Sequence, residues 1–416
     1  MIIRDKLNKL LQIDNYKVLS QLGKGGFGTV YHVKDISTDR EYALKLLHNA
    51  FNISRIKKQF EILKILNSSD YFLKTYQSKK IVGSFYLLLE FSSNINLEKS
   101  VKTEILSESK ACSIILNIVE SLRFLQKNEI IHGDVKAENI LKKGERYFLI
   151  DFDVSKRGSL VKTLHIQGDD DFTAPEIYRG VQTSSSDIYS LGCTLYYMLT
   201  SEHIYGFTKE DDFSQKMYAH LYSQQISNKN ISRKMFYLIS RMTDKDYKKR
   251  ATIDEIREIL HPDYRFLFVA FSDKTKEDRF ESKFDRYMFM AEDSISYAQN
   301  IVGLMYEEGL EVQKDLGEAL KWYRLAVEQG LAKAQFNLAL CYKMAKGCEQ
   351  SYTKSIELFT KAADQEHNRS FYHLADMYEK GLGVEEDMKK ANELYKESAL
   401  YGYKPAYKKL QELLQE

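Results

Sequence analysis

Proline and cysteine are both scarce in this chain. Its 416 residues include 3 prolines and 4 cysteines. So few prolines exclude long proline-rich linkers. The cysteines (Cys112, Cys193, Cys341 and Cys348) form no C-x-x-C pair and no metal-site spacing with histidine. We therefore interpret them as free thiols in a reducing compartment.

The chain also lacks an excess of charge and a long apolar run. Its 61 basic and 59 acidic residues give a net charge of +2, which argues against a nucleic-acid partner or a membrane-binding patch. No stretch reaches the roughly 18 apolar residues of a membrane span, and residues 1–12 lack the apolar core of a signal peptide. We expect a cytoplasmic protein, although export as an effector without a signal peptide stays open.

A chain of 416 residues needs more than one hydrophobic core. Within the first 260 residues, the pattern of apolar residues changes from strand-like to helical. The strand-like runs are Tyr16–Leu22, Thr29–Val33, Glu41–Leu47 and Ser84–Phe91. One helical pattern, Ser54–Leu66, interrupts them, and long helical patterns such as Ser109–Gln126 dominate from Ser107 onward. This order predicts a small strand-rich lobe followed by a larger helical lobe.

A period of 36 residues begins near Tyr297. Five columns of small or aromatic residues keep this spacing. They are Tyr306, Tyr342 and Tyr378; Ala298, Ala334 and Ser370; Tyr323, Phe359 and Tyr395; Ala319, Ser355 and Ala391; and Ala326, Ala362 and Ser398. The period predicts helix pairs that must stack on one another to bury their apolar faces.

A glycine-rich string, Gly23, Gly25 and Gly28, lies between two strand patterns. Such a string alone is a weak signal, because Rossmann folds use a similar one before a helix. Here a strand follows. This favours a hairpin that folds over phosphates, since glycine lets backbone N–H groups approach oxygen atoms closely.

The strongest signal is the segment His132–Asn139, which Asp151-Phe152-Asp153 follows at a spacing of 12 residues from Asn139. Phosphoryl transfer needs a group that orients the attacking hydroxyl, cations on the phosphates, and carboxamide and carboxylate ligands for Mg²⁺. That set is present in order as Asp134, Lys136, Asn139 and Asp151.

With these motifs, residues 14–260 resemble the eukaryotic-type protein kinase family. The resemblance implies an α+β bilobal protein kinase fold with a small β-rich N-lobe and a helical C-lobe. It implies ATP and Mg²⁺ as cofactors, Asp134 as the catalytic base and Lys136 beside the γ-phosphate. It also implies that Asn139 and Asp151 bind Mg²⁺.

The resemblance further implies an ATP site under the glycine-rich hairpin. Lys45 would pair with Glu61 on the helix and hold the α- and β-phosphates, and Leu89 would be the gatekeeper. The implied ATP-binding residues are Leu22, Gly23, Gly25, Gly28, Val30, Ala43, Lys45, Glu61, Leu89, Glu90, Ser92 and Leu141.

Two further matches concern the support of the site. Ala174-Pro175-Glu176 resembles the end of the activation segment, and Glu176 should pair with Arg250. Asp187 matches the helix residue that braces the catalytic loop.

Three positions depart from the family pattern. Gly133 stands where many kinases carry an arginine that clamps a phosphate, so we expect activity without phosphorylation of the activation segment. Asp153 replaces a glycine, which should reduce flipping of the triplet without loss of metal binding. The acidic run at residues 169–171 favours either basic substrates or a solvated turn.

The second half of the chain resembles Sel-one-like repeats, relatives of the tetratricopeptide class, through motifs such as Trp322-Tyr323 and residues 377–384. It should form an all-α helix-pair solenoid. The expected units are a kinase domain at 14–260, a connecting segment or degenerate first repeat at 262–294, three repeats at 295–403 and a capping helix at 404–416.

These features predict an ATP- and Mg²⁺-dependent kinase that phosphorylates serine or threonine in proteins. Lys136, two places after Asp134, favours this class over tyrosine kinases. The repeats would recruit substrate or partner proteins, or act as a spacer or brace. Two other hypotheses stay open: a pseudokinase scaffold, and a kinase that acts on a small molecule or lipid.

Overall fold

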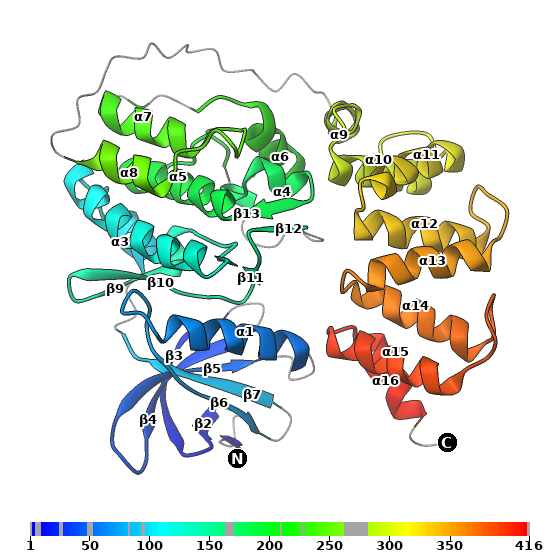
Figure 1. Ribbon diagram of the computed structural model, residues 1–416, viewed down its shortest axis with the longest axis horizontal. Helices are drawn as coiled ribbons and strands as arrows, with labels where there is room; N and C mark the ends of the chain where they lie inside the picture. Colours follow the sequence, from blue (N-terminus) through cyan, green and yellow to red (C-terminus); the bar gives the residue numbers. More distant parts are fainter. Residues whose placement is uncertain are drawn as a thin grey trace.

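The computed structural model describes residues 2–4, 10–24, 28–47, 53–81, 84–92, 96–162, 170–208, 210–225, 228, 230–261 and 282–413. A strand-rich small lobe, a larger helical lobe and a column of helix pairs follow one another (Figure 1). The α+β bilobal fold with a trailing helix-pair solenoid is therefore confirmed. Within the described residues, no helix has the length and apolar character that a membrane crossing requires.

The small lobe is built on one antiparallel sheet with strand order β1-β2-β3-β4-β5-β7-β6. The strands are β1 (Ile2–Arg4), β2 (Leu10–Ile13), β3 (Tyr16–Lys24), β4 (Gly28–Asp35), β5 (Glu41–Leu47), β6 (Thr75–Ile81) and β7 (Ser84–Glu90). Helix α1 (Ile53–Leu66) lies against this sheet (Figure 1). The four predicted strands and the helix are confirmed, whereas β1, β2 and β6 were not predicted. The sequence of β6, TYQSKKI, is mostly polar, and therefore it did not show the apolar pattern of a strand.

Side chains alternate across the sheet, as the period of a strand requires. On one face, Leu44 and Leu46 of β5 pack with Tyr86 and Leu88 of β7 in a buried cluster. The other face of β5 therefore carries Ala43 and Lys45 toward the rest of the molecule.

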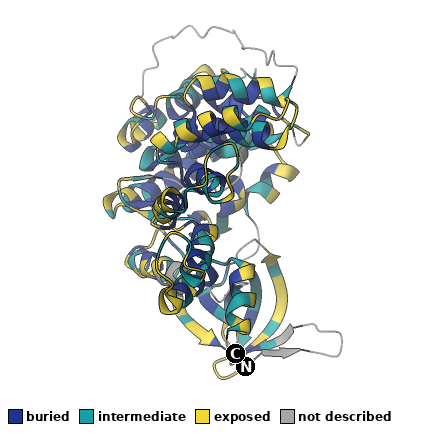
Figure 2. Ribbon diagram, turned by 90° about the vertical axis from the view of Figure 1, so that its right-hand side faces the viewer, coloured by how far each residue is buried: buried dark blue, intermediate teal, exposed yellow. Residues whose placement is uncertain are grey.

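The large lobe is mostly helical. Its elements are α2 (Leu97–Thr103), α3 (Glu108–Lys127), β8 (Ile130–Ile131), η1 (Ala137–Asn139), β9 (Ile140–Lys143), β10 (Arg146–Leu149), β11 (Lys156–Arg157), β12 (Leu160–Lys162), η2 (Asp170–Phe172), α4 (Pro175–Tyr178), β13 (Val181–Thr183), α5 (Ser184–Thr200), α6 (Phe213–Tyr222), α7 (Arg233–Met242) and α8 (Ile253–Leu260). Helix α5 is buried along most of its length, and a capping box formed by Thr183 and Ser186 fixes its start. Figure 2 shows buried and exposed residues alternating along the helices of the molecule, as expected for helices with one face turned toward the interior.

The column of helix pairs, here called the array, extends from residue 283 to residue 412. Its helices are α9 (Lys283–Glu292), α10 (Ser296–Glu308), α11 (Leu316–Glu328), α12 (Ala332–Met344), α13 (Tyr352–Ala363), α14 (Asn368–Glu379), α15 (Met388–Leu400) and α16 (Lys404–Glu412). Side chains of Asp315, Ser351 and Asp387, each 36 residues from the next, cap the second helix of each pair.

The 36-residue columns occupy equivalent places in the array. Four columns are buried in all three units, for example Tyr323, Phe359 and Tyr395 between the two helices of each pair. The fifth column, which contains Tyr306, is partly buried. The predicted helix pairs are thus confirmed, and small side chains let the helices approach each other closely.

The array packs directly on the large lobe. Tyr178 of α4 and Met217 of α6 belong to the same buried cluster as Met290 of α9 and Trp322 of α11. Arg286 of α9, itself buried, donates to Ser214 Oγ at 2.8 Å. The two parts therefore share one hydrophobic core.

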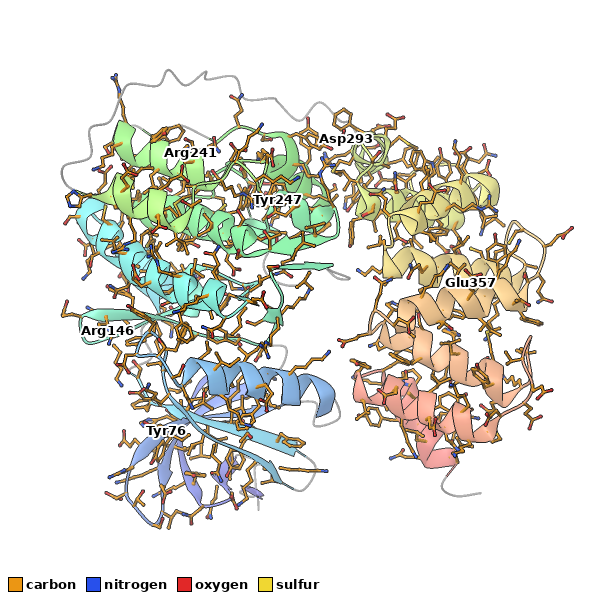
Figure 3. All side chains as sticks on the ribbon, viewed as in Figure 1. Tyr76, Arg146, Arg241, Tyr247, Asp293 and Glu357 are labelled. Atoms are coloured by element: carbon orange, nitrogen blue, oxygen red, sulfur yellow. The ribbon has the colours of Figure 1, made fainter. Side chains whose placement is uncertain are left out.

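Polar contacts surround this shared core. Asp293, at the end of α9, accepts from the Tyr222 hydroxyl at 2.6 Å and lies 3.4 Å from Arg179. Figure 3 labels Asp293 at the junction between the large lobe and the array. Farther along, Glu366 forms an ion pair with Lys58 of α1, so the array also touches the small lobe.

We predict that Met290→Ala lowers the free energy of unfolding of the whole protein by about 2–5 kcal/mol, because it opens a cavity in the shared core. Urea unfolding should be followed by the fluorescence of Trp322, the only tryptophan, and by far-UV circular dichroism. Both transitions should move together. The exposed Glu292→Ala on the same helix should change stability by less than about 0.5 kcal/mol. A shift of the tryptophan transition alone would contradict a shared core.

Candidate active site

Strand register gathers several of the expected ATP-binding residues on one face of the sheet. Val30 lies opposite Lys45, which lies opposite Leu87, and Ala43 lies opposite Leu89. Residues opposite each other in an antiparallel pair point to the same face, and so do residues two apart. Val30, Ala43, Lys45 and Leu89 therefore share one face.

The glycine-rich string forms the β3–β4 hairpin. A Cβ on Gly28 would lie 2.7 Å from the Leu46 carbonyl oxygen, so close strand packing alone demands glycine there. A Cβ on Gly23 would meet no atom within 4 Å, which leaves room for another molecule. Leu22 is half-buried at the same strand end, and Gly25 lies outside the described residues.

The end of β7 and the residues after it, which include the expected ATP-binding residues Glu90 and Ser92, are tied to the large lobe. The Glu90 carboxylate pairs with Lys143 of β9 and accepts from the Lys74 backbone N–H at 3.0 Å. Ser92 is buried and donates to the Lys142 carbonyl oxygen at 3.1 Å. Leu141, on the same strand, is half-buried. β9 thus joins the two lobes here.

A buried carboxylate fixes the catalytic loop. Asp187, near the start of α5, accepts backbone N–H bonds from His132 and Gly133, both at 2.8 Å. This confirms the bracing role that the sequence predicted. His132 Nε2 donates to the Ile150 carbonyl oxygen at 3.1 Å, and its Nδ1 accepts from the Asp134 N–H at 3.2 Å. Burial lowers the pKa of His132, which keeps this imidazole neutral.

The short η1 turn brings the expected catalytic and metal-binding groups together. Asn139 Nδ2 donates to Asp134 Oδ2 at 2.8 Å and to its backbone carbonyl at 2.9 Å. Lys136 Nζ lies 3.4 Å from Asp134 Oδ1 and equally far from Glu138. The Ile150 N–H bonds to the Asn139 carbonyl at 2.9 Å, which places Asp151 next to this turn.

Lys45 connects the small lobe to the metal-binding triplet. Its Nζ lies 2.8 Å from Asp151 Oδ1 and 2.6 Å from Asp153 Oδ2. Burial lowers the pKa of Lys45, but the charges of the two aspartates outweigh burial and hold it above its usual value. Burial likewise raises the pKa of Asp151, and Lys45 then brings it below its usual value. The ammonium and the Asp151 carboxylate are thus both charged.

The prediction that Glu61 of α1 is the partner of Lys45 is wrong. Glu61 is 61% exposed and pairs with Lys64 at 3.1 Å, while Gln59 Nε2 donates to Asp153 Oδ1. Sequence reasoning missed Gln59 because it searched α1 for a carboxylate. The signal that could have identified Gln59 is its spacing of three, four and seven residues from the buried Ile62, Leu63 and Leu66.

Two departures from the family pattern have structural explanations. Gly133 has φ of 82°, and a Cβ there would lie 2.6 Å from Nε2 of the buried Gln182, so no larger residue fits without a rearrangement. Independence from phosphorylation stays a prediction. Asp171 is not a solvated charge, because it pairs with Lys216 at 2.7 Å and lies 3.5 Å from His203. Residue 169 and the side chain of residue 170 lie outside the described part.

Behind the site, Glu176 and Arg250 form the predicted ion pair, which is confirmed. Two parallel bonds of 2.6 Å join the carboxylate and the guanidinium, and both side chains are almost completely buried. Ser186 adds a hydroxyl bond to Glu176 at 2.6 Å. Bidentate geometry with satisfied neighbours is the arrangement in which a buried pair is stable.

The donor set suits Mg²⁺ and phosphate. Asn139 uses its Nδ2 toward Asp134, so its amide oxygen is the atom left to face a cation, and Asp151 adds a carboxylate. No group of three or more His, Cys, Asp or Glu side chains that could hold a metal occurs among the described residues. Two oxygen ligands from protein fit Mg²⁺, which usually completes its shell with water and substrate phosphates.

Comparison with known families agrees with both halves of the fold. The model of the protein kinase domain matches residues 16–264. The Sel1 repeat model matches residues 296–331, 332–367 and 372–402.

The similar curated proteins are protein kinases by name, and several of them are named serine/threonine-protein kinases. The probable serine/threonine-protein kinase zyg-1 of Caenorhabditis elegans is 28% identical over 199 residues, which cover 46% of this chain and 28% of that protein. Calcium-dependent protein kinase 4 of Plasmodium falciparum is 28% identical over 243 residues (55% and 46%). Serine/threonine-protein kinase PLK4 of Drosophila sechellia is 26% identical over 261 residues (60% and 33%). The aligned part thus spans less than half the length of each of these relatives.

We predict that Glu176→Gln lowers the free energy of unfolding by about 3–5 kcal/mol, because it leaves the Arg250 charge buried without its partner. Urea denaturation measures this loss. As a control, Lys249→Ala removes a nearby surface pair with Asp246 and should cost no more than about 1 kcal/mol. Equal effects of the two substitutions would show that the buried pair contributes no more than a surface one.

Proposed function

The chain belongs to the protein kinase family, and from this premise we propose that it is an ATP- and Mg²⁺-dependent kinase that phosphorylates serine or threonine in proteins. One observation carries the proposal. Asp134, Asn139, Asp151 and Lys45 form one site, connected by the Asp134–Asn139 bond, the Asn139–Ile150 bond and the Lys45–Asp151 pair.

In the proposed reaction, Asp134 orients the substrate hydroxyl and accepts its proton as the phosphoryl group is transferred. The Asn139 amide holds this carboxylate at 2.8 Å, and Asn139 itself is the last residue of η1. Positioning of this kind supplies much of the catalysis, since phosphoryl transfer needs little covalent help from the protein.

Two cationic side chains would stabilise the phosphates. Lys136, 3.4 Å from Asp134, is placed to steady the γ-phosphate, and Lys45 would hold the α- and β-phosphates. Mg²⁺, when bound through Asn139 and Asp151, would neutralise the charge that develops on the phosphate oxygens. Val30, Ala43 and Leu141, three of the expected ATP-binding residues, are proposed to pack against the two faces of the adenine ring.

The array has two proposed roles. Its shared core with α4 and α6 supports a brace, because removal of the array would expose Tyr178 and Met217 to water. Recruitment of protein partners is proposed for the remaining surface, since stacked helix pairs present an extended curved face. The two roles are compatible, because α9 to α11 hold the array in place while later helices stay accessible.

A reducing compartment is proposed for the protein, because its four cysteines are free thiols. Burial raises the pKa of Cys193 and Cys341 to about 12. These two thiols would therefore be unreactive and serve only as packing groups.

We predict that Asp134→Ala lowers the rate of phosphate transfer to generic protein substrates by about 10²–10⁴-fold, the usual contribution of a positioned base. Binding of ATP should persist, because Lys45 and the sheet are untouched. Transfer is measured with radiolabelled ATP. The matched control is Glu145→Ala, which changes a 90% exposed carboxylate on the β9–β10 turn and should leave transfer unchanged.

Other outcomes would identify the alternative functions. A wild-type protein that binds ATP but transfers no phosphate would be a pseudokinase scaffold. Label found only on lipids or metabolites, and never on protein, would identify a kinase for small molecules. Neither result is expected.

We predict that Arg369→Glu weakens capture of a protein substrate about two- to tenfold in KM, a loss of about 0.4–1.4 kcal/mol, and leaves KM for ATP unchanged. Arg369 is exposed on α14 and lies over Phe336 of α12, 4.6 Å from the ring centre, so it spans two repeats. The control is Lys361→Glu, which makes the same change of charge on α13, the second helix of its pair. Equal KM values for both variants and wild type would remove this surface from substrate capture.

A further inference from the structure

Lys45 has a second carboxylate partner that the family pattern does not provide. Asp153 Oδ2 lies 2.6 Å from Lys45 Nζ, and these side chains are only 7% and 11% exposed. Asp151, the other partner, is 38% exposed. The shorter and more deeply buried contact is therefore the one with Asp153, at the position where the family usually has glycine.

Helix α1 meets this pair through an amide. Gln59 Nε2 donates to Asp153 Oδ1, so Gln59 and Lys45 contact different oxygens of Asp153. Gln59 carries no charge and cannot form an ion pair with Lys45. It can, however, fix the position of a carboxylate that does.

The packing of α1 keeps Glu61 away from Lys45. Residues two apart on a helix point about 200° apart, whereas those three, four and seven apart share a side. Ile62, Leu63 and Leu66 thus lie on the side of Gln59 and are at most 8% exposed. Turning Glu61 toward Lys45 would move these three side chains out of the core.

We propose that Asp153 is the positioning residue for Lys45: it supplies the carboxylate that the family takes from the helix, and Gln59 ties it to α1. This inference rests on the proposed kinase function. The helix has a glutamine, Gln59, where it could have offered a carboxylate to Lys45, and Asp153 in the triplet supplies that carboxylate instead. The carboxylate has moved from one side of Lys45 to the other, and the site keeps one carboxylate partner that is not a proposed metal ligand.

The test exchanges the two positions. Asp153→Gly and Asp153→Asn should each weaken binding of a fluorescent ATP analogue about tenfold or more, because Lys45 loses its buried partner. Gln59→Glu combined with Asp153→Gly restores a carboxylate from the helix, and binding should return to within about threefold of wild type. Glu61→Gln should change binding less than about twofold.

Binding is measured in equilibrium titrations, and KM for ATP and kcat are measured separately. Melting temperatures identify any variant that fails to fold. If Asp153→Gly fails to fold, the isosteric Asp153→Asn still tests the proposal. Displacement of Lys45 should weaken ATP binding and raise KM for ATP more than it changes kcat. The double variant should recover both ATP binding and KM for ATP.

Three results would overturn the proposal. They are tighter ATP binding or faster transfer in folded Asp153 variants, no recovery in the double variant, and a tenfold loss in Glu61→Gln. Failure of the kinase function looks different, since wild type itself would then transfer no phosphate. An active wild type whose double variant does not recover would reject the role of Asp153 alone.

Discussion

The buried carboxylate of Asp187 is the constraint on which the rest of the site depends. It accepts the backbone N–H groups of His132 and Gly133, and Gly133 adopts a left-handed conformation in which a side chain would collide with Gln182. An unpaired buried carboxylate is costly, so the loop must stay where both N–H groups reach it. From this fixed point the bonds run outward to Asp134, to Asn139 and across the β9–β10 hairpin to Asp151. The geometry needed for phosphoryl transfer therefore follows from one interaction behind the reacting groups.

Sequence reasoning reached the parts of this site that local motifs encode. The Glu176–Arg250 pair and the role of Asp187 could be predicted, because the residues next to them fix their identity within the family pattern. The partner of Lys45 could not, because it depends on which side of α1 faces the sheet. Burial of Ile62 and its neighbours decides that question, and a carboxylate about half a turn out of phase, Glu61, misled the assignment. The contact between Asp153 and Lys45 joins residues 108 positions apart, and no motif records it.

The repeats show the same limit in a different form. Period and helix pairs were readable, but the polar contacts inside the units were not. In the first and third units, Tyr323 and Tyr395 donate to Glu307 and Glu379, at 2.8 and 2.6 Å. In the second unit, Phe359 lacks the hydroxyl and Lys343 replaces the glutamate, bonding to Asp376 at 2.6 Å instead. Glu307 and Glu379 also pair with Lys346 and Lys409, so the tyrosine hydroxyl adds a further partner to each glutamate. In the second unit the two columns change together. Likewise, side-chain bonds between Gln299 and Gln329 and between Gln335 and Gln365 give way to the stacked rings of Phe371 and Tyr401.

Magnitudes decide how the array is held. Among the described residues, the ion pair that joins it to the small lobe is Lys58–Glu366, whose side chains are 66% and 46% exposed. Such a surface pair contributes about 0–1 kcal/mol at most. Its contact with the large lobe includes Tyr178, Met217, Met290 and Trp322 in one buried cluster, and burial of each such side chain contributes about 1.5–3 kcal/mol. The array must therefore move with the large lobe. A movement of the small lobe relative to the array would break this weak pair, whereas the links between the small and the large lobe include Lys45–Asp151 and Glu90–Lys143. Lys58 directly precedes Gln59 on α1, so the weak pair with the array lies on the same helix that contacts Asp153. The array therefore restrains this helix only weakly, and the helix can move together with the nucleotide site.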